Sequence, residues 1–122
     1  MTHIVNRGVA VLGHRLFVGT LVAALVALDA RTGRPLWEVQ VADSLLGYSL
    51  TSPPLIVKDK VLVGITGGEF GARGFLDAYD AATGRRLWRW YAVPGPGEFG
   101  NDTWQGDSWK LGGSPMWLTG SY

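Results

Sequence analysis

Short apolar runs alternate with turn residues along the chain. The first four runs span residues 8–12, 16–20, 25–29 and 36–41. Four further runs span residues 54–58, 61–65, 75–80 and 87–92. Val, Leu, Phe and Trp fill these runs and Gly, Asp and Pro separate them, which is typical of short strands joined by tight turns. Because no stretch keeps a helical period over three turns, the pattern predicts an all-β chain without helices.

An internal repeat groups the runs into two units. Residues Ala27–Trp37 recur as Ala78–Trp88, 51 positions later, with the shared pattern Ala-x-Asp-x-x-Thr-Gly-x-x-x-Trp. Upstream, Arg15–Gly19 matches Lys60–Gly64, 45 positions later. Four strands per unit, joined by hairpins, are the pattern of a propeller blade. The predicted organisation is a blade at about 7–41, a blade at about 54–92, a loop at 93–113 and the start of another blade at 114–122.

The second unit is six residues longer than the first between the two matched blocks. The extra residues fall within 66–74, whose sequence is Thr-Gly-Gly-Glu-Phe-Gly-Ala-Arg-Gly. Repeats form a scaffold, so a local departure from the repeat is where we expect a site. A carboxylate such as Glu69, taken alone, is more often a solvated loop residue than a ligand, but its place in a glycine-rich insertion that breaks the repeat favours a ligand.

The repeated motif itself is interpreted as structural. Asp and Thr side chains can bind the backbone of a tight turn, and the Gly supplies the positive φ that such a turn needs. The Trp four residues later is a large flat anchor that can reach a neighbouring unit. The residues assigned to this scaffold are Asp29, Thr32, Trp37, Asp80, Thr83 and Trp88. Asp107 and His14 are likewise expected in exposed turns.

Composition narrows the function classes. The 122 residues carry a formal net charge of +1 with scattered basic residues, which gives no argument for binding nucleic acid or an anionic membrane. Cysteine is absent, so disulfides and thiolate metal sites are excluded within this sequence. No apolar run is long enough for a membrane span, and the N-terminus lacks the layout of a signal peptide. The 18 glycines and 6 tryptophans fit short strands, tight turns and aromatic anchors.

The repeated motif resembles the tryptophan-docking motif of quinoprotein dehydrogenases, which are eight-bladed propellers that bind pyrroloquinoline quinone (PQQ). Three other segments resemble the same family in the same order. They are Val5–Gly8, the glycine-rich Thr66–Gly74, and Gly106–Trp117, which contains Gly-Asp-Ser-Trp-Lys and Gly-Gly-x-Pro-x-Trp. The docking motif is shared with non-enzymatic propellers, but the ordered combination of four segments is specific.

The resemblance implies roles for seven residues. Arg7 and Thr51 would bind polar edges of PQQ, and Thr66, Gly67 and Gly68 would line its rim. Glu69 would ligate a calcium or lanthanide ion, because a hard cation prefers carboxylate oxygen. Trp117 would be the floor on which the planar quinone stacks. The simpler alternatives are a surface cation for Arg7, strand threonines for Thr51 and Thr66, and a packing role for Trp117.

The implied activity is oxidation of a primary alcohol to an aldehyde, with electrons passed to a cytochrome c or a quinone in the periplasm. The Leu118-Thr119-Gly120 that follows Trp117 is closer to the general alcohol type than to the methanol type. Met1 and Thr2 stand where the family has adjacent cysteines, and the family's aspartate base and metal-binding asparagine would lie beyond Tyr122. We therefore expect a fragment that is inactive and marginally folded by itself. The alternative is a non-catalytic propeller that binds proteins, as in outer-membrane assembly lipoproteins.

Overall fold

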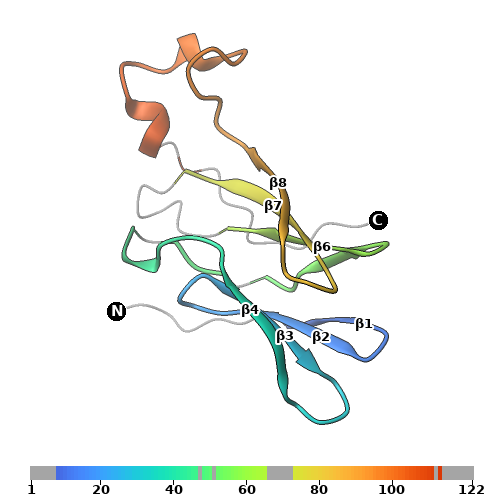
Figure 1. Ribbon diagram of the computed structural model, residues 1–122. Helices are drawn as coiled ribbons and strands as arrows, with labels where there is room; N and C mark the ends of the chain where they lie inside the picture. Colours follow the sequence, from blue (N-terminus) through green and yellow to red (C-terminus); the bar gives the residue numbers. More distant parts are fainter. Residues whose placement is uncertain (1–7, 47, 51, 66–72, 112, 114–122) are drawn as a thin grey trace.

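The computed structural model describes residues 8–46, 48–50, 52–65, 73–111 and 113. They form two four-stranded antiparallel sheets, each with its strands in chain order (Figure 1). The first sheet comprises β1 (Ala10–Leu12), β2 (Arg15–Gly19), β3 (Ala24–Asp29) and β4 (Pro35–Gln40). The second comprises β5 (Leu55–Val57), β6 (Lys60–Gly64), β7 (Phe75–Asp80) and β8 (Arg86–Tyr91). The prediction of an all-β chain with two antiparallel four-stranded units is confirmed.

The repeated turn after the third strand of each sheet is built by its Asp, Thr and Gly. In the second sheet, Asp80 Oδ1 accepts the backbone N–H groups of Ala82 and Thr83 at 2.8 and 3.2 Å. Thr83 Oγ1 accepts the N–H of Arg85 at 3.2 Å, and Gly84 takes the positive φ of 78° that closes the turn. Asp29, Thr32 and Gly33 repeat this arrangement in the first sheet. The structural interpretation of these residues is confirmed.

Trp37 joins the two sheets. Its indole Nε1 donates to the carbonyl oxygen of Ala81, 3.1 Å away in the turn of the second sheet. The ring lies against Gly84, where an added Cβ would come within 2.6 Å of it. The glycine therefore serves two purposes, the positive φ of its turn and the close approach of the indole.

The two sheets pack against each other through one apolar cluster. The first sheet contributes the face that carries Phe17, Leu25 and Ala27, and the second contributes the face that carries Val61 and Tyr79; these five side chains are at most 1% exposed. Buried and less buried positions alternate along β2 and β6, as expected for strands with one buried face. Burial of this apolar cluster therefore stabilises the packing of one sheet on the other.

The long segment after β8 contains two of the three short 3₁₀ helices in the described residues. These helices are η1 (Ser44–Leu46), η3 (Asn101–Thr103) and η4 (Ser108–Leu111). These are single 3₁₀ turns, and the described residues contain no α-helix, as the sequence predicts. A single turn closed by contacts such as Lys110 N–H to Asp107 O, 3.0 Å, is too short to leave a periodic signal in sequence.

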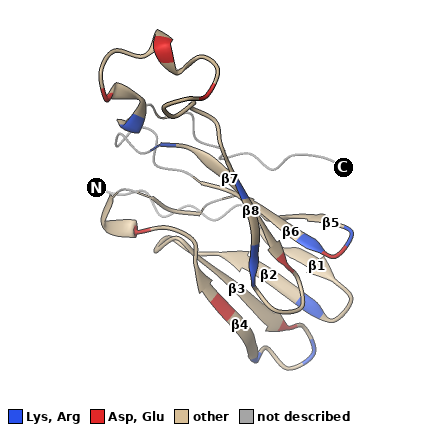
Figure 2. Cartoon of the chain, turned by 45° about the horizontal axis from the view of Figure 1, so that its top comes forward, with Lys and Arg blue, Asp and Glu red and all other residues tan. Residues whose placement is uncertain are grey.

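Charged residues are scattered over the turns and the strands (Figure 2). Asp107 lies in an exposed turn beside Lys110, with 3.6 Å between carboxylate and ammonium. His14 is exposed in the β1–β2 turn. Both match the turn positions expected from sequence.

Candidate functional site

The seven residues singled out from sequence lie outside the described residues. They are Arg7, Thr51, Thr66, Gly67, Gly68, Glu69 and Trp117. Their placement as a site stays a prediction. The residues that flank them are described, however, and their contacts show how the scaffold is arranged around these four segments.

The glycine-rich insertion connects two paired strands. Ile65 and Phe75 bracket it, and the Ile65 N–H donates to the Phe75 carbonyl oxygen at 3.2 Å. In the first sheet the equivalent connection is a tight turn, in which the Thr20 N–H donates to the Ala24 carbonyl oxygen at 2.9 Å. Only residues 21–23 lie between that pair, against residues 66–74 in the second sheet. The six-residue expansion is therefore confined to one end of the β6–β7 hairpin.

The described residues next to Arg7, Thr51, the insertion and Trp117 contact one another in pairs. Gly74, the last residue of the insertion, donates its N–H to the carbonyl oxygen of Gly113, 2.7 Å away. Gly113 lies four positions before Trp117. Gly8, which follows Arg7, faces Pro53, where an added Cβ would lie 3.4 Å from the Pro53 Cγ. A third contact joins the stretch before Thr51 to the end of the insertion, through Tyr48 and Arg73. Segments far apart in sequence are thus tied together at their ends.

Arg73 is the centre of this junction. Its Nε and Nη2 donate to the carbonyl oxygen of Val93 at 3.0 and 2.6 Å. The guanidinium carbon lies 3.8 Å from the ring centroid of Tyr91 and 4.8 Å from that of Trp109. A guanidinium that stacks on aromatic rings gains about 0.5–2 kcal/mol from each cation–π contact.

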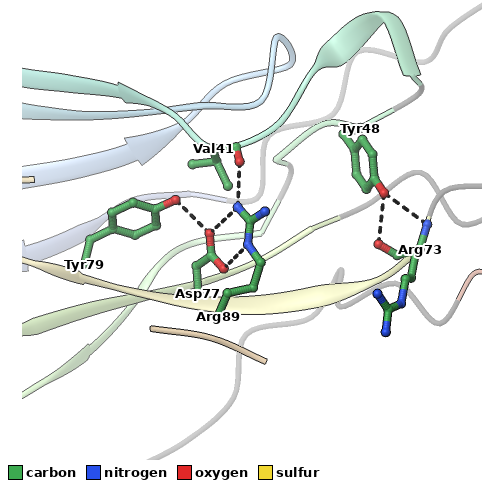
Figure 3. Close-up of polar contacts among 6 residues, drawn as sticks. All are labelled: Val41, Tyr48, Arg73, Asp77, Tyr79 and Arg89. Atoms are coloured by element: carbon green, nitrogen blue, oxygen red, sulfur yellow. Dashed lines mark hydrogen bonds and ion pairs between the residues drawn. The ribbon is translucent and has the colours of Figure 1, made fainter. Parts of the chain in front are cut away.

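Tyr48 holds the backbone of Arg73. Its hydroxyl accepts the Arg73 N–H and donates to the Arg73 carbonyl oxygen, each at 3.2 Å (Figure 3). Its ring packs on Phe75, with 5.7 Å between centroids, and Phe75 packs edge-on against Tyr91 at 5.8 Å. Tyr48, Phe75, Tyr91 and Arg73 therefore form a closed ring of contacts.

A buried ion pair lies further along the same sheet. Asp77 is fully buried on β7. Its two carboxylate oxygens accept hydrogen bonds from Nε and Nη2 of Arg89, at 2.7 and 2.8 Å (Figure 3). Arg89 Nη2 also donates to the carbonyl oxygen of Val41, 2.8 Å away, which follows β4 of the first sheet. Tyr79 completes the network by donating its hydroxyl to Asp77 Oδ2 at 2.7 Å. The network ties the two sheets together with all its buried polar atoms paired.

The protonation states of this network follow from its environment. Burial, and then the hydrogen bond to Asp77, raise the pKa of Tyr79 above its ordinary value, so the hydroxyl remains a donor. Burial works to lower the pKa of Arg89, but its hydrogen bonds, first that to Asp77, outweigh burial and raise the pKa. Both groups keep their protons at neutral pH, which suits a structural clamp rather than proton transfer.

Sequence reasoning missed Arg73, Tyr48 and the Asp77–Arg89 pair. The pair had left a signal: Asp77 stands where the first repeat has Val26, and Arg89 where it has Glu38. These positions pair across the β7–β8 ladder, as Val26 and Glu38 do across β3–β4. A carboxylate in an apolar strand position with a cation directly opposite indicates a buried pair.

The described part of the chain holds no cluster of three or more His, Cys, Asp or Glu that could bind a metal ion. No helix in the same residues is long and apolar enough to cross a membrane. Glu69, the predicted metal ligand, lies outside these residues, so its role stays a prediction.

Known proteins give the family. A family profile described as "PQQ: Glucose/ethanol/alcohol dehydrogenase, beta-propeller domain" matches residues 3–122. The quinohemoprotein alcohol dehydrogenase ADH IIB of Pseudomonas putida is 46% identical over 129 residues, which cover 97% of this chain and 19% of that protein. The lanthanide-dependent methanol dehydrogenase of Methylacidiphilum fumariolicum (strain SolV) is 44% identical over 138 residues, covering 98% of this chain and 22% of that protein. The chain thus spans about a fifth of the length of these relatives.

Solved structures agree with these relatives. A europium-containing methanol dehydrogenase superposes with a TM-score of 0.85 and 44% identity, over 93% of this chain and 23% of that chain. BamB from Moraxella catarrhalis superposes less well, with a TM-score of 0.55 and 33% identity, over 72% of this chain and 24% of its own. The fold is therefore that of a β-propeller, of which the two sheets are blades. The family match over nearly the whole sequence shows that this chain belongs to the PQQ-dependent glucose, ethanol and alcohol dehydrogenases, as part of their β-propeller domain.

Proposed function

We propose that this chain supplies one side of the PQQ and metal site of an enzyme that oxidises a primary alcohol to an aldehyde. Glu69 is the metal ligand, and Trp117 is the surface on which the cofactor stacks. Arg7, Thr51, Thr66, Gly67 and Gly68 contact its polar edges. The metal is calcium or a lanthanide.

The observation that carries the proposal is the pairing of the flanks around the expanded hairpin. Gly74 binds Gly113, Arg73 binds Tyr48, and Gly8 faces Pro53. A pure scaffold repeat has no need of six additional residues, since the first sheet closes the same hairpin with a tight turn. The end of the expansion is thus bonded to the stretches that lead to Thr51 and to Trp117, and Gly8, next to Arg7, faces the stretch that follows Thr51.

The donor chemistry fits a quinone held beside a hard cation. A carboxylate is a preferred ligand of calcium. Glycines on either side of it allow the backbone to approach a flat ligand closely, and an indole face suits a planar ring system. When bound, PQQ would supply a two-electron acceptor for the alcohol, and the cation held by Glu69 would supply a Lewis acid. The chain's residues bind and orient the group; electrons leave to a cytochrome c or a quinone, and the enzyme acts in the periplasm.

The test uses a chimera, because the chain spans about a fifth of its relatives. The aligned stretch of the Pseudomonas putida alcohol dehydrogenase is replaced by this chain, and PQQ retained after gel filtration is measured against calcium or lanthanum concentration. We expect metal-dependent PQQ binding and alcohol oxidation. Glu69→Gln should raise the half-saturating metal concentration by at least about tenfold.

The matched control is Glu38→Gln, which removes an exposed carboxylate from β4. It should leave metal and PQQ binding unchanged. If Glu69→Gln behaves like Glu38→Gln, the site assignment is wrong.

The competing function is a scaffold that binds other proteins. The observation in its favour is the exposed apolar face of the second sheet, where Trp88 and Trp90 are 41% and 55% exposed. A chimera that folds but binds PQQ at no metal concentration would favour this alternative.

A further inference from the structure

We propose that Arg73 and Tyr48 are positioning residues for the segment that carries Glu69. This inference rests on the proposed function and adds two residues to which sequence gave no role. Neither residue is placed in contact with the cofactor. They act by fixing the backbone at the point where the insertion returns to β7.

The side chain of Arg73 is held from three directions. Two of its nitrogens donate hydrogen bonds to the carbonyl oxygen of Val93, at 3.0 and 2.6 Å. Its guanidinium carbon lies over the rings of Tyr91 and Trp109, 3.8 and 4.8 Å from their centroids. Gly95 also packs on it, since an added Cβ there would lie 3.1 Å from Nη2. A planar guanidinium can satisfy stacking and forked hydrogen bonding together, whereas an ammonium cannot.

The backbone of Arg73 is held separately by Tyr48. One hydroxyl engages both the N–H and the carbonyl oxygen of the same residue at 3.2 Å. Its ring is in turn supported by Phe75, at 5.7 Å between centroids. The peptide groups on either side of Arg73 are thereby fixed relative to the core of the second sheet.

Arg73 is close in sequence to Glu69, and its neighbour Gly74 is hydrogen-bonded to the stretch that leads to Trp117. Arg73 follows Glu69 by four positions, and its neighbour Gly74 binds Gly113, four positions before Trp117. Trp109, on the chain leading to Trp117, stacks on the Arg73 guanidinium. Groups hydrogen-bonded directly to a metal ligand cost about 10- to 100-fold in metal affinity when they are lost. Because Arg73 and Tyr48 act on Glu69 only through the intervening backbone, we expect effects at or below the lower end of that range.

The experiment uses the chimera described above, with Arg73→Ala, Arg73→Lys and Tyr48→Phe. Two quantities are measured on each variant: the melting temperature without metal, and the metal concentration at which half of the PQQ is retained. We expect Arg73→Ala to raise that concentration about tenfold, and Arg73→Lys to restore little of it. Tyr48→Phe removes the hydroxyl alone and should raise it about threefold. Excess metal should restore full PQQ retention in each variant.

Arg86→Ala is the control, because Arg86 is an exposed arginine on β8. A purely structural role would lower the melting temperature without moving the metal concentration. If every variant that folds keeps the half-saturating concentration of Arg86→Ala, the inference is wrong. If Glu69→Gln also leaves it unchanged, the proposed function fails too; if Glu69→Gln raises it, only the positioning role fails.

Discussion

The two sheets share one repeat but bury opposite faces of it. In the first sheet, the face with Phe17, Ala27 and Trp37 packs on the second sheet. In the second sheet, the equivalents of the last two residues are Ala78 and Trp88, on the face that points away. Trp37 is therefore docked, whereas Trp88 is 41% exposed.

This difference teaches that position in the array, and not the motif, decides what a repeated residue contacts. Gly33 and Gly84 both adopt positive φ, 74° and 78°, but only Gly84 is covered by an indole. The second sheet has also changed the face it turns toward the first, placing Asp77 and Arg89 where the first repeat has Val26 and Glu38. Each sheet thus has one face that carries the repeated docking tryptophan and an opposite face whose residues differ between the two repeats.

The largest expected change in the free energy of unfolding comes from the face of the second sheet that carries Asp77 and Arg89. Asp77→Asn leaves the Arg89 charge without its carboxylate inside the interface, which should lower the free energy of unfolding by about 3–5 kcal/mol. Urea unfolding of the 122-residue chain, followed by tryptophan fluorescence in a stabilising osmolyte, measures it. Glu38→Gln, at the position equivalent to Arg89, should change it by less than about 0.5 kcal/mol. Equal effects of the two substitutions would contradict the asymmetry of the faces.

The next effect compares the two tryptophans. Trp37→Ala empties the docking site between the sheets and should lower the free energy of unfolding by about 3 kcal/mol. Trp88→Ala, on the exposed face, should cost less than about 1 kcal/mol and should reduce aggregation of the chain. Urea unfolding and light scattering measure the two quantities. A Trp88 variant as unstable as the Trp37 variant would show that Trp88 is already docked in this chain.

The smallest effect separates backbone strain from docking. Gly33→Ala and Gly84→Ala both force alanine to positive φ, at about 1 kcal/mol each. Gly84→Ala also pushes a methyl group against the Trp37 ring, which adds about 1–3 kcal/mol. The difference between the two free energies of unfolding therefore reports the docking contact alone. In a Trp37→Ala background this difference should vanish.

The local architecture was predictable because each sheet is made of consecutive hairpins. Strand positions follow from apolar runs, and the Asp-x-x-Thr-Gly turns carry their own chemistry, as Asp80 and Thr83 show. Arg73 was not predictable in the same way, because its partners Tyr48, Val93 and Trp109 come from segments that no local pattern connects. The candidate site residues are predicted from the order of the family motifs along the chain. The structure adds the contacts made by the residues next to them.

The hydrogen bond from Trp37 to Ala81 spans 44 residues, and that from Arg89 to Val41 spans 48. Contacts within each sheet are between neighbouring strands, so each sheet can form early while their interface forms late. During synthesis the first sheet must present Phe17 and Trp37 uncovered until the turn that holds Gly84 has left the ribosome. At about 5–20 residues per second, that interval lasts several seconds. The tryptophan that docks the two sheets is thus also, during synthesis, an apolar surface of the first sheet that chaperones or a wrong partner can bind.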